Sequence, residues 1–591
     1  MTQLLGTAIF WCIFAAFVSH HLRAHVHVEA SATHLEAPEE QWGEEGTGDT
    51  PRGWCGSHHS AINPDDVPIV GTMPPESEAK GTTGGDLISA RTASVDKKPK
   101  YTNNVDDYGQ GEIDSRWKPI RIRAYTQDLN DPSRFCTMAG DVRSILVSGK
   151  TTVCTAGDVL TVRKKRVIVQ VAIPKAIKLH TDRLLVRRYH RRIVLPSSYA
   201  GYCSLFKVPK GHYTNGFEGD VSIYVAARPT IGNMAWASVC AMLTDGRPVS
   251  GVVNISPKYV AETDFFVRVI AHELGHALGF QADILIRRGI MKQKGGIRGL
   301  KTSWLVDSEV AKRVARKHFN CSTAPGIEME NEGGPGVFAT HLEQRNAVED
   351  VMAPYGNLNY LTVMSLGVFA SMGHYRVNFS RAEKTRWGLN RGCSFLQEKC
   401  LQEGKSKHPD TFCDHLWKSR LFTCTHDRLG LGQCSLGTHR TELPAEFRYF
   451  RNSRVGGKSR FMDHCPMVVQ YNSGNCVNGQ SKFLRGSEVG KGSRCVKGVN
   501  LKFSNKDIGD VCVRTNCTGK ELQIRFLLDH SWQTCKPGAT VQPLGRHLWK
   551  GSIICPTREE VCFDDEDYKL RLTPLPKLPT DDNAAVNPRQ M

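Results

Sequence analysis

The sequence has one long hydrophobic run, Leu4 to Val18, in a chain of 591 residues. The run is shorter than the roughly 20 apolar residues that a transmembrane helix needs, so residues 1–22 are interpreted as a secretory signal peptide. No lysine or arginine precedes the run, which leaves an uncleaved signal anchor as the alternative. The stretch from Thr573 to Met591 is polar and proline-rich. Without a hydrophobic end it predicts neither a GPI anchor nor a second span.

The sequence also lacks a recognisable nucleic-acid-binding module, although the protein is basic. Its formal net charge is +18, and basic residues cluster at Arg163–Arg166 and Arg187–Arg192. The first cluster precedes Val167-Ile168-Val169, which favours a strand with a solvated face. We therefore expect no nucleic-acid partner. A contact with a polyanion or an acidic surface is the alternative interpretation of the two clusters.

The cysteines indicate an oxidising compartment. Of 20 cysteines, Cys12 lies in the signal segment and Cys55 in an irregular N-terminal region, which leaves 20 − 2 = 18 between Cys136 and Cys562. This even number predicts a disulfide framework and a secreted or cell-surface protein. Glycosylation sequons agree with secretion, and Asn254 is doubtful because its segment is expected to be a core strand. The sequons lie at Asn254, Asn320, Asn378 and Asn516.

The strongest motif is His-Glu-x-x-His at His272–His276, inside an apolar stretch. Residues four apart share one helical face, so His272 and His276 can both reach a single ion. Glu273 sits one step round the helix, close enough to touch an activated water without ligating the metal. Such polar residues are costly in a buried helix unless they are paired or ligate something. The motif predicts a zinc peptidase with Glu273 as general base; a surface helix with two unrelated histidines is the alternative.

The segments before this helix predict mostly strands. Alternation or apolar runs favour strands at 119–125, 220–227, 234–243 and 251–256, and Val159 to Leu179 favours a strand followed by a helix. Strands followed by a metal-binding helix predict an α/β or α+β catalytic domain. Met234–Ser238 is the candidate edge that binds substrate backbone as an added strand, and an ordinary core strand is the alternative.

A zinc peptidase needs a third protein ligand that leaves one position for water. The compact form of the motif places a histidine at position 282, which is Ala282 here. The downstream candidates are His318, His341 and His374. His318 ends an amphipathic basic helix and is expected to be exposed, whereas His341 lies shortly before Asp350-Val351-Met352-Ala353-Pro354. The residues alone leave this choice open.

Residues 23–112 are rich in Gly, Ser, Thr, Pro and charged residues, with little periodicity. This composition is typical of a pro-segment rather than a packed domain. Cys55 stands alone within it, in Gly53-Trp54-Cys55-Gly56. A lone thiolate in the pro-region of a zinc enzyme can fill the open metal position until cleavage. Cys55 is therefore interpreted as a zymogen latch, with an incidental unpaired cysteine as the alternative.

The arrangement of the motif resembles the leishmanolysin family of trypanosomatid surface metalloproteases. The resemblance rests on His272–Phe280, a long insertion, His341 and the Met352-Ala353-Pro354 segment, and it extends from about Arg116 to Cys562. Segments 126–132, 206–209 and 251–255 are similar to the family's catalytic domain. Segments 387–396 and 461–466 are similar to its later domains.

The resemblance implies an α+β fold with a metzincin-like catalytic domain (113–281), an inserted central domain (282–398), a Cys-rich, mostly β C-terminal domain (399–575) and a polar tail (576–591). It implies that His272, His276 and His341 bind one Zn²⁺ and that Glu273 is the base. Met352 would be the methionine of the turn beneath the metal, while Met364 and Met372, the competing methionines, are expected in a helix core. Cys55 resembles the family's pro-region cysteine.

The expected function is a secreted or cell-surface zinc metalloendopeptidase, made as a zymogen and acting on proteins or peptides, with host or surface proteins as further partners. Two family features are not carried over: the GPI signal, and an adhesion motif whose place is taken by Lys258–Asp264. The competing hypothesis is an inactive surface adhesion protein on the same scaffold. The intact motif and His341 argue against it. A structural zinc site is disfavoured because such sites usually have four protein ligands.

Overall fold

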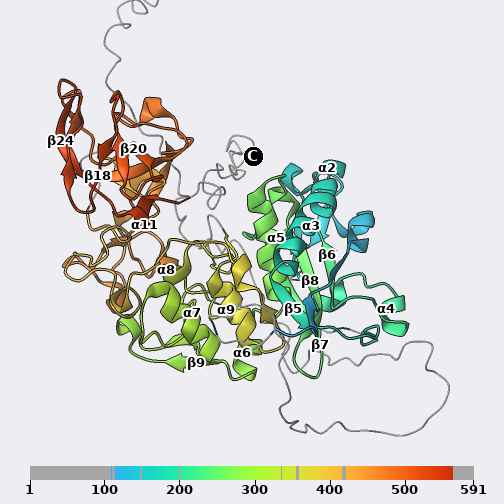
Figure 1. The fold of residues 1–591 in the computed structure, drawn as a ribbon. Coiled ribbons are helices and arrows are strands. Elements are labelled where there is room, and N and C mark those ends of the chain that lie inside the picture. The colour runs from blue at the N-terminus through green and yellow to red at the C-terminus, as the bar shows by residue number, and fades with distance from the viewer. Residues whose placement is uncertain are drawn as a thin grey trace, which may run out of the picture.

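The computed structural model describes residues 108, 113–146, 149–197, 199, 201–334, 336–354, 359–415 and 421–563 (Figure 1). The predicted signal peptide, the latch cysteine Cys55, nearly all of the predicted pro-segment and the polar tail lie outside these residues. Among the described residues, no helix combines the length and the apolar character that crossing a membrane requires.

A four-stranded sheet supports the helix that carries His272 and His276. Its order is β2 (Ile122–Tyr125), β6 (Val221–Ala226), β8 (Pro248–Ile255) and β7 (Ala235–Met242). The first three strands are parallel, and β7 pairs antiparallel with β8 at the edge. All residues of β6 and β8 are buried, which explains their continuous apolar runs. The sheet confirms the strands predicted around 220–227, 234–243 and 251–256.

The two faces of this sheet are covered differently. On one face, Val221, Ile223 and Val225 of β6 join the core formed with helices α3 (Ile173–Thr181) and α5 (Asp264–Ala277). On the other face, Tyr224 of β6 and Trp236 of β7 pack in a second cluster with residues between Leu195 and Phe217. The helices therefore lie on the face from which α5 can present its polar residues to the central part of the chain.

The strand predicted after Arg163–Arg166 is wrong. Residues 162–181 form one helical run made of α2 (Val162–Arg166), a π-helical turn (Val167–Ala172) and α3. The β-branched residues suggested a strand, but Ile168, Ala172, Ala176 and His180 are buried at intervals of four, and burial of this helical face outweighs local propensity. The single strand predicted at 119–125 is also interrupted, because β1 (Trp117–Pro119) joins a different sheet from β2.

The central part of the chain is mixed. Helices α6 (Ala282–Arg287), α7 (Glu309–Phe319), α8 (Gln344–Ala347) and α9 (Val363–Ser371) accompany a sheet of β11 (Ile327–Met329), β10 (Ser303–Val306) and β9 (Met291–Lys294). A second small sheet joins β1, β5 (Leu184–Arg187) and β12 (Arg376–Val377). Since β1 and β5 precede α5 and β12 follows α9, this sheet ties the central part to the N-terminal part.

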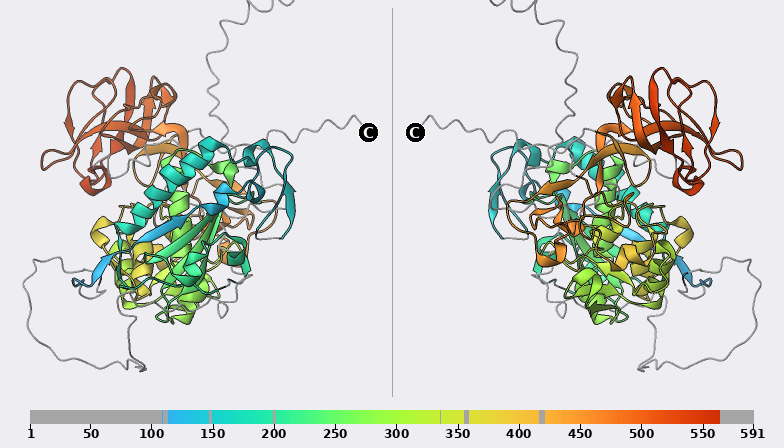
Figure 2. Two further views of the ribbon diagram at one scale, coloured as in Figure 1. Left: turned by 90° about the vertical axis from the view of Figure 1, so that its right-hand side faces the viewer. Right: turned by 90° about the vertical axis from the view of Figure 1, so that its left-hand side faces the viewer.

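The C-terminal part is mostly β and rich in disulfides. A three-stranded sheet contains β13 (Thr423–Cys424), β14 (Gly430–Cys434) and β17 (Val468–Asn475), and a hairpin pairs β15 (Leu436–Thr438) with β16 (Val455–Gly457). A larger sheet contains β22 (Gln533–Thr534), β21 (Gln523–Arg525), β20 (Val511–Asn516), β18 (Ser493–Phe503), β24 (Trp549–Ile554), β23 (Thr540–Val541) and β19 (Lys506–Asp507). The strands of this larger sheet, orange to red, gather at one end of the molecule (Figure 2).

All eighteen cysteines from Cys136 to Cys562 are paired, which confirms the predicted disulfide framework. The pairs are Cys136–Cys154, Cys203–Cys240, Cys321–Cys393, Cys400–Cys465, Cys413–Cys434, Cys424–Cys495, Cys476–Cys512, Cys517–Cys562 and Cys535–Cys555. The mixed N-terminal and central parts, followed by this disulfide-rich β region, confirm the α+β class. Asn254 is fully buried on β8, which agrees with the doubt about its sequon.

Candidate metal centre

Helix α5 carries the motif and is buried along almost its whole length. Thr263 caps the N-terminus by accepting a hydrogen bond from the Phe266 backbone N–H at 3.2 Å. Every residue from Phe265 to Ala277 is buried. The chain leaves the helix at Gly279, whose φ of +102° is a conformation that L side chains rarely adopt. Residues His272, Glu273 and His276 therefore sit in the protein interior.

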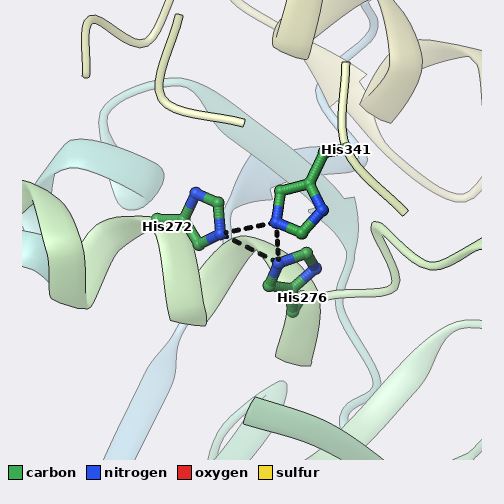
Figure 3. Close-up of side chains that lie close together, drawn as sticks. All are labelled: His272, His276 and His341. Carbon is green, nitrogen blue, oxygen red and sulfur yellow. Dashed lines mark hydrogen bonds between the residues drawn. The ribbon is translucent and has the colours of Figure 1, made fainter. Parts of the chain in front are cut away.

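Three histidine side chains converge at one point (Figure 3). The Nε2 atom of His276 lies 2.9 Å from that of His272 and 3.3 Å from that of His341, and the third distance, between His341 and His272, is 3.2 Å. Their exposed fractions are 2%, 0% and 0% for His272, His276 and His341. The fold thus brings His341 to His272 and His276, which precede it by 69 and 65 positions.

Each imidazole is oriented through its other nitrogen. His272 Nδ1 lies 2.5 Å from the Val351 carbonyl oxygen, and His276 Nδ1 lies 2.8 Å from that of Phe280. His341 Nδ1 lies 3.1 Å from the Val337 carbonyl oxygen. Because a carbonyl only accepts, this network assigns the proton to Nδ1 in each ring and leaves Nε2 with a lone pair. Burial also lowers the pKa of His272 to about 4, which keeps its ring neutral.

This donor set fits a zinc ion. Three unprotonated Nε2 atoms crowded into a buried space repel one another, and a cation between them turns that repulsion into attraction. Zn²⁺ binds imidazole nitrogens at about 2.0–2.1 Å in a tetrahedral arrangement, which separates the nitrogens by roughly 3.3 Å. The observed separations of 2.9–3.3 Å are close to that value. Hydrogen bonds from Nδ1 to carbonyl oxygens are the usual outer contacts of zinc-binding histidines.

The other two candidates for a third ligand lie elsewhere. His318 is buried, and its Nε2 lies 2.8 Å from the Trp387 carbonyl oxygen, so the prediction that it is exposed is wrong. Position 318 follows Val314 and Ala311 by four and seven residues, on the buried face of α7. His374 is also buried and packs edge-on against Tyr375. Neither belongs to the histidine cluster.

Met352 lies directly against α5. A Cβ atom built at Gly275, between the two motif histidines, would lie 2.6 Å from the Met352 sulfur, so glycine is what allows this close contact. Met352 is fully buried. The competing methionines belong to α9 as expected: Met364 is buried within that helix and Met372 is its C-terminal cap.

Asp350 organises the turn that contains Met352, a role that the sequence reasoning missed. Its carboxylate accepts hydrogen bonds from the Met352 backbone N–H at 2.7 Å and from the hydroxyls of Thr362 and Ser365. Burial raises the pKa of Asp350, although these hydrogen bonds oppose the increase. The sequence signal for this role was an aspartate two residues before the methionine, together with Thr362 and Ser365 at the start of the next helix.

Two further side chains hold α5 in place. The His180 ring on α3 lies 2.7 Å from the Ala271 carbonyl oxygen, and burial lowers the pKa of His180 to about 4. Arg268, one turn before His272, forms two hydrogen bonds with the Glu383 carboxylate and donates to the Asn359 carbonyl oxygen at 2.8 Å. Glu383 also accepts from the Leu361 backbone N–H at 2.7 Å. The helix is therefore tied to the segment that follows the Met352 turn.

Replacing Arg268 by leucine is expected to lower the free energy of unfolding by about 3 kcal/mol at neutral pH, because a largely buried carboxylate would lose its partner. Burial alone would raise the pKa of Glu383, but the hydrogen bonds and charge of Arg268 outweigh it and lower that pKa below the usual value. A depressed folded-state pKa gives stability that is present above the unfolded pKa, about 4.3, and is lost as pH falls through the folded pKa.

Urea unfolding at pH 7 and at pH 3 checks this prediction. The difference between wild type and Arg268→Leu should shrink at pH 3. Arg287→Leu on α6 is the matched control, because Arg287 is exposed and its ion pair with Asp283 across 4.0 Å should contribute less than about 1 kcal/mol. Equal losses for the two variants at pH 7 would contradict the role of Arg268.

Comparisons with known proteins agree with this geometry. A family described as leishmanolysin, a peptidase family, matches residues 74–568. The chain is 33% identical to leishmanolysin of Leishmania tropica over 76% of this chain and 70% of that protein. It is 32% identical to leishmanolysin of Leishmania major over 80% and 81% of the two chains, and 24% identical to a leishmanolysin-like peptidase of Drosophila melanogaster over 58% and 63%.

These matches extend over most of the chain, and the family is zinc-dependent. Its members are peptidases, so proteins or peptides are the substrate class. The paired cysteines suit an extracellular protein. The chain belongs to the leishmanolysin family of metalloendopeptidases.

Proposed function

We propose that this protein hydrolyses peptide bonds with one zinc ion held by His272, His276 and His341 and with Glu273 as the general base. The observation that carries the proposal is the convergence of the three Nε2 atoms within 3.3 Å of one another. Each ring is fixed through Nδ1, so the lone pairs point inward without further rearrangement. An inactive adhesion protein has no need for such an arrangement.

Zinc bound there would polarise a peptide carbonyl and lower the pKa of a water molecule towards about 7. Glu273 follows His272 on α5 and is fully buried. In the proposed mechanism its carboxylate takes the proton from the attacking water and then delivers it to the leaving amine. Met352 packs against Gly275 and supports the helix from below without ligating the metal.

Strand β7 is proposed to bind the substrate backbone. Among the described strands, β7 pairs only with β8, and the two strands are antiparallel. Strand β7 is therefore the edge of the sheet. Ala235 to Ser238 lie on this strand, which packs against α5 through Met234, Ala235, Phe265 and Val269. An extended substrate could add to this edge by main-chain hydrogen bonds, which would place its scissile bond beside α5.

Several further parts of the proposal rest on the sequence. Residues 23–112 would be an inhibitory pro-segment, Cys55 its latch, and residues 1–22 a signal that directs the protein to the cell surface or medium. The catalytic, central and C-terminal domains would span 113–281, 282–398 and 399–575. Proteins of a host or of the cell surface would be the physiological partners.

The choice of third ligand is tested by comparing His341→Ala with His374→Ala, a second buried histidine outside the cluster. We expect His341→Ala to weaken zinc binding by more than about 100-fold, since even outer contacts of a metal site are worth 10–100-fold, and to abolish casein cleavage. His374→Ala should keep one zinc per chain and cleave casein.

The measurements are zinc content by mass spectrometry after dialysis, and casein hydrolysis, on protein freed of residues 23–112. Circular dichroism establishes that each variant is folded. If His341→Ala retains one zinc per chain and His374→Ala loses its zinc, the third ligand is His374 rather than His341. Zinc in the wild type without any cleavage would favour the adhesion hypothesis.

A further inference from the structure

Four of the most exposed large apolar side chains belong to one short stretch of the chain. Val162 is 88% exposed, Met138 and Val153 are each 63% exposed, and Val142 is 58% exposed. Exposed apolar residues are ordinary when scattered singly, but a group of them marks a contact surface. We call these four residues the apolar ridge. It contains none of the metal-centre residues.

The ridge is held on a stiff support. Val142 and Val153 are opposite each other on the hairpin of β3 (Val142–Ser144) and β4 (Thr151–Val153), so their side chains point to the same face. The disulfide Cys136–Cys154 and a parallel bridge between Cys136 and Val159 tie the neighbouring segments to this hairpin. The bridge and a hydrogen bond from the Leu160 backbone N–H to the Cys136 carbonyl oxygen place Cys136 beside Val159. Met138 follows Cys136 by two residues, and Val162 follows Val159 by three.

Basic residues adjoin the ridge in an arrangement that helix stability does not favour. The helical run 162–181 contains six lysines and arginines and no acidic residue. Four of them, Arg163–Arg166, occupy its first turns, where the helix dipole disfavours cations. Lys164 and Lys165 are bound to oxygens of the protein. Arg163 and Arg166 are exposed and form no ion pair with any residue that the structure describes.

We propose that the apolar ridge, together with Arg163 and Arg166, is a contact surface for a membrane that contains anionic lipids. Figure 1 shows α2, which carries both arginines, at the outer edge of the molecule. The cations alone would suit any polyanion. The four exposed apolar side chains lower the free energy only when they leave water. An anionic bilayer offers both negative headgroups and an apolar layer a few ångströms below them.

This surface accounts for the arginine–lysine cluster without reference to catalysis. Insertion of Met138, Val142, Val153 and Val162 would remove their apolar area from water, and anionic headgroups would offset the repulsion among Arg163 to Arg166. The disulfide-tied hairpin limits the ordering that insertion requires. The protease would then act at the surface of a cell or vesicle rather than dispersed in solution.

Flotation of the purified full chain with vesicles tests the proposal. One set of vesicles contains phosphatidylcholine alone, and a second contains phosphatidylcholine with about 30 mol% of the anionic lipid phosphatidylserine. We expect binding to the anionic vesicles that falls as salt is raised. Met138→Ser combined with Val142→Ser and Val153→Ser should weaken this binding about tenfold or more. Arg163→Glu with Arg166→Glu should do the same, since each basic residue near the surface contributes several-fold.

Matched controls separate membrane insertion from general charge and folding. Leu528→Ser removes an equally exposed apolar residue (61%) elsewhere, and Lys520→Glu with Lys536→Glu removes two exposed cations of the C-terminal part. Neither should alter vesicle binding. Once residues 23–112 have been removed, the four variants should hydrolyse a soluble peptide as fast as wild type does, which establishes that they are folded.

Binding to soluble heparin identifies the other source of negative charge. If the serine variant binds vesicles as wild type does and only the glutamate variant loses both vesicles and heparin, the surface is a polyanion site and the membrane proposal fails. Absence of wild-type binding to anionic vesicles also overturns it. Neither result would alter the proposed zinc mechanism, because its residues are not in the surface.

Discussion

Replacing Glu273 by glutamine is expected to reduce peptide hydrolysis by about 10⁴-fold while leaving one zinc ion bound. Glutamine has nearly the same volume as glutamate, so it fits the same fully buried position on α5. It cannot accept the proton of the attacking water, and it cannot return a proton to the leaving amine. General acid–base catalysis by one residue is worth about 10²–10⁴-fold, and Glu273 would serve both transfers.

The measurement is kcat/KM on a fluorogenic peptide, with zinc content determined on the same samples. Glu309→Gln is the control, because Glu309 is an exposed glutamate in the first turn of α7 and should leave both quantities unchanged. A Glu273→Gln variant that retains activity within about tenfold of wild type would remove the carboxylate from the mechanism. Loss of zinc along with activity would assign it a role in metal binding.

The part of the candidate metal centre on α5 could be predicted from the sequence, because helical geometry alone relates His272, Glu273 and His276. A spacing of four residues on an apolar stretch fixes one face and one direction. His341 is different. It reaches the other two histidines only after the chain has built β9–β11 and α7, so spacing left three candidates and the choice rested on family resemblance. The tertiary structure, not the local sequence, brings the Nε2 atoms of His276 and His341 within 3.3 Å of each other.

The predictions that failed share a cause. Val167-Ile168-Val169 has the local composition of a strand, and His318 follows a run of basic residues, yet both lie on buried helical faces. Local composition does not reveal which face a neighbouring element covers. For the same reason the sequence gives little sign of His180 or Arg268, whose partners Ala271 and Glu383 are 91 and 115 residues away.

Asp350→Ala is expected to lower the free energy of unfolding by about 4 kcal/mol and to weaken zinc binding about 10–100-fold. The carboxylate is the shared acceptor for Met352, Thr362 and Ser365. Its removal leaves several buried donors without an acceptor and frees the turn. That turn supplies the Val351 carbonyl oxygen that orients His272 and the Met352 carbonyl oxygen that accepts from the backbone N–H of Leu342, next to His341.

Urea unfolding and competition for zinc with a chelator measure these two effects, and kcat on a soluble peptide measures the consequence for catalysis. Asp350→Asn should be intermediate, because an amide retains one acceptor oxygen but turns an NH₂ group towards a donor. Asp507→Ala, at an exposed position of β19, is the control and should change none of them. If Asp350→Ala loses stability but binds zinc as tightly as wild type, the turn stabilises the fold without orienting His272. If zinc affinity and kcat fall in Asp350→Asn while most of the stability remains, Asp350 is a positioning residue that acts on the metal centre through Val351 and Met352.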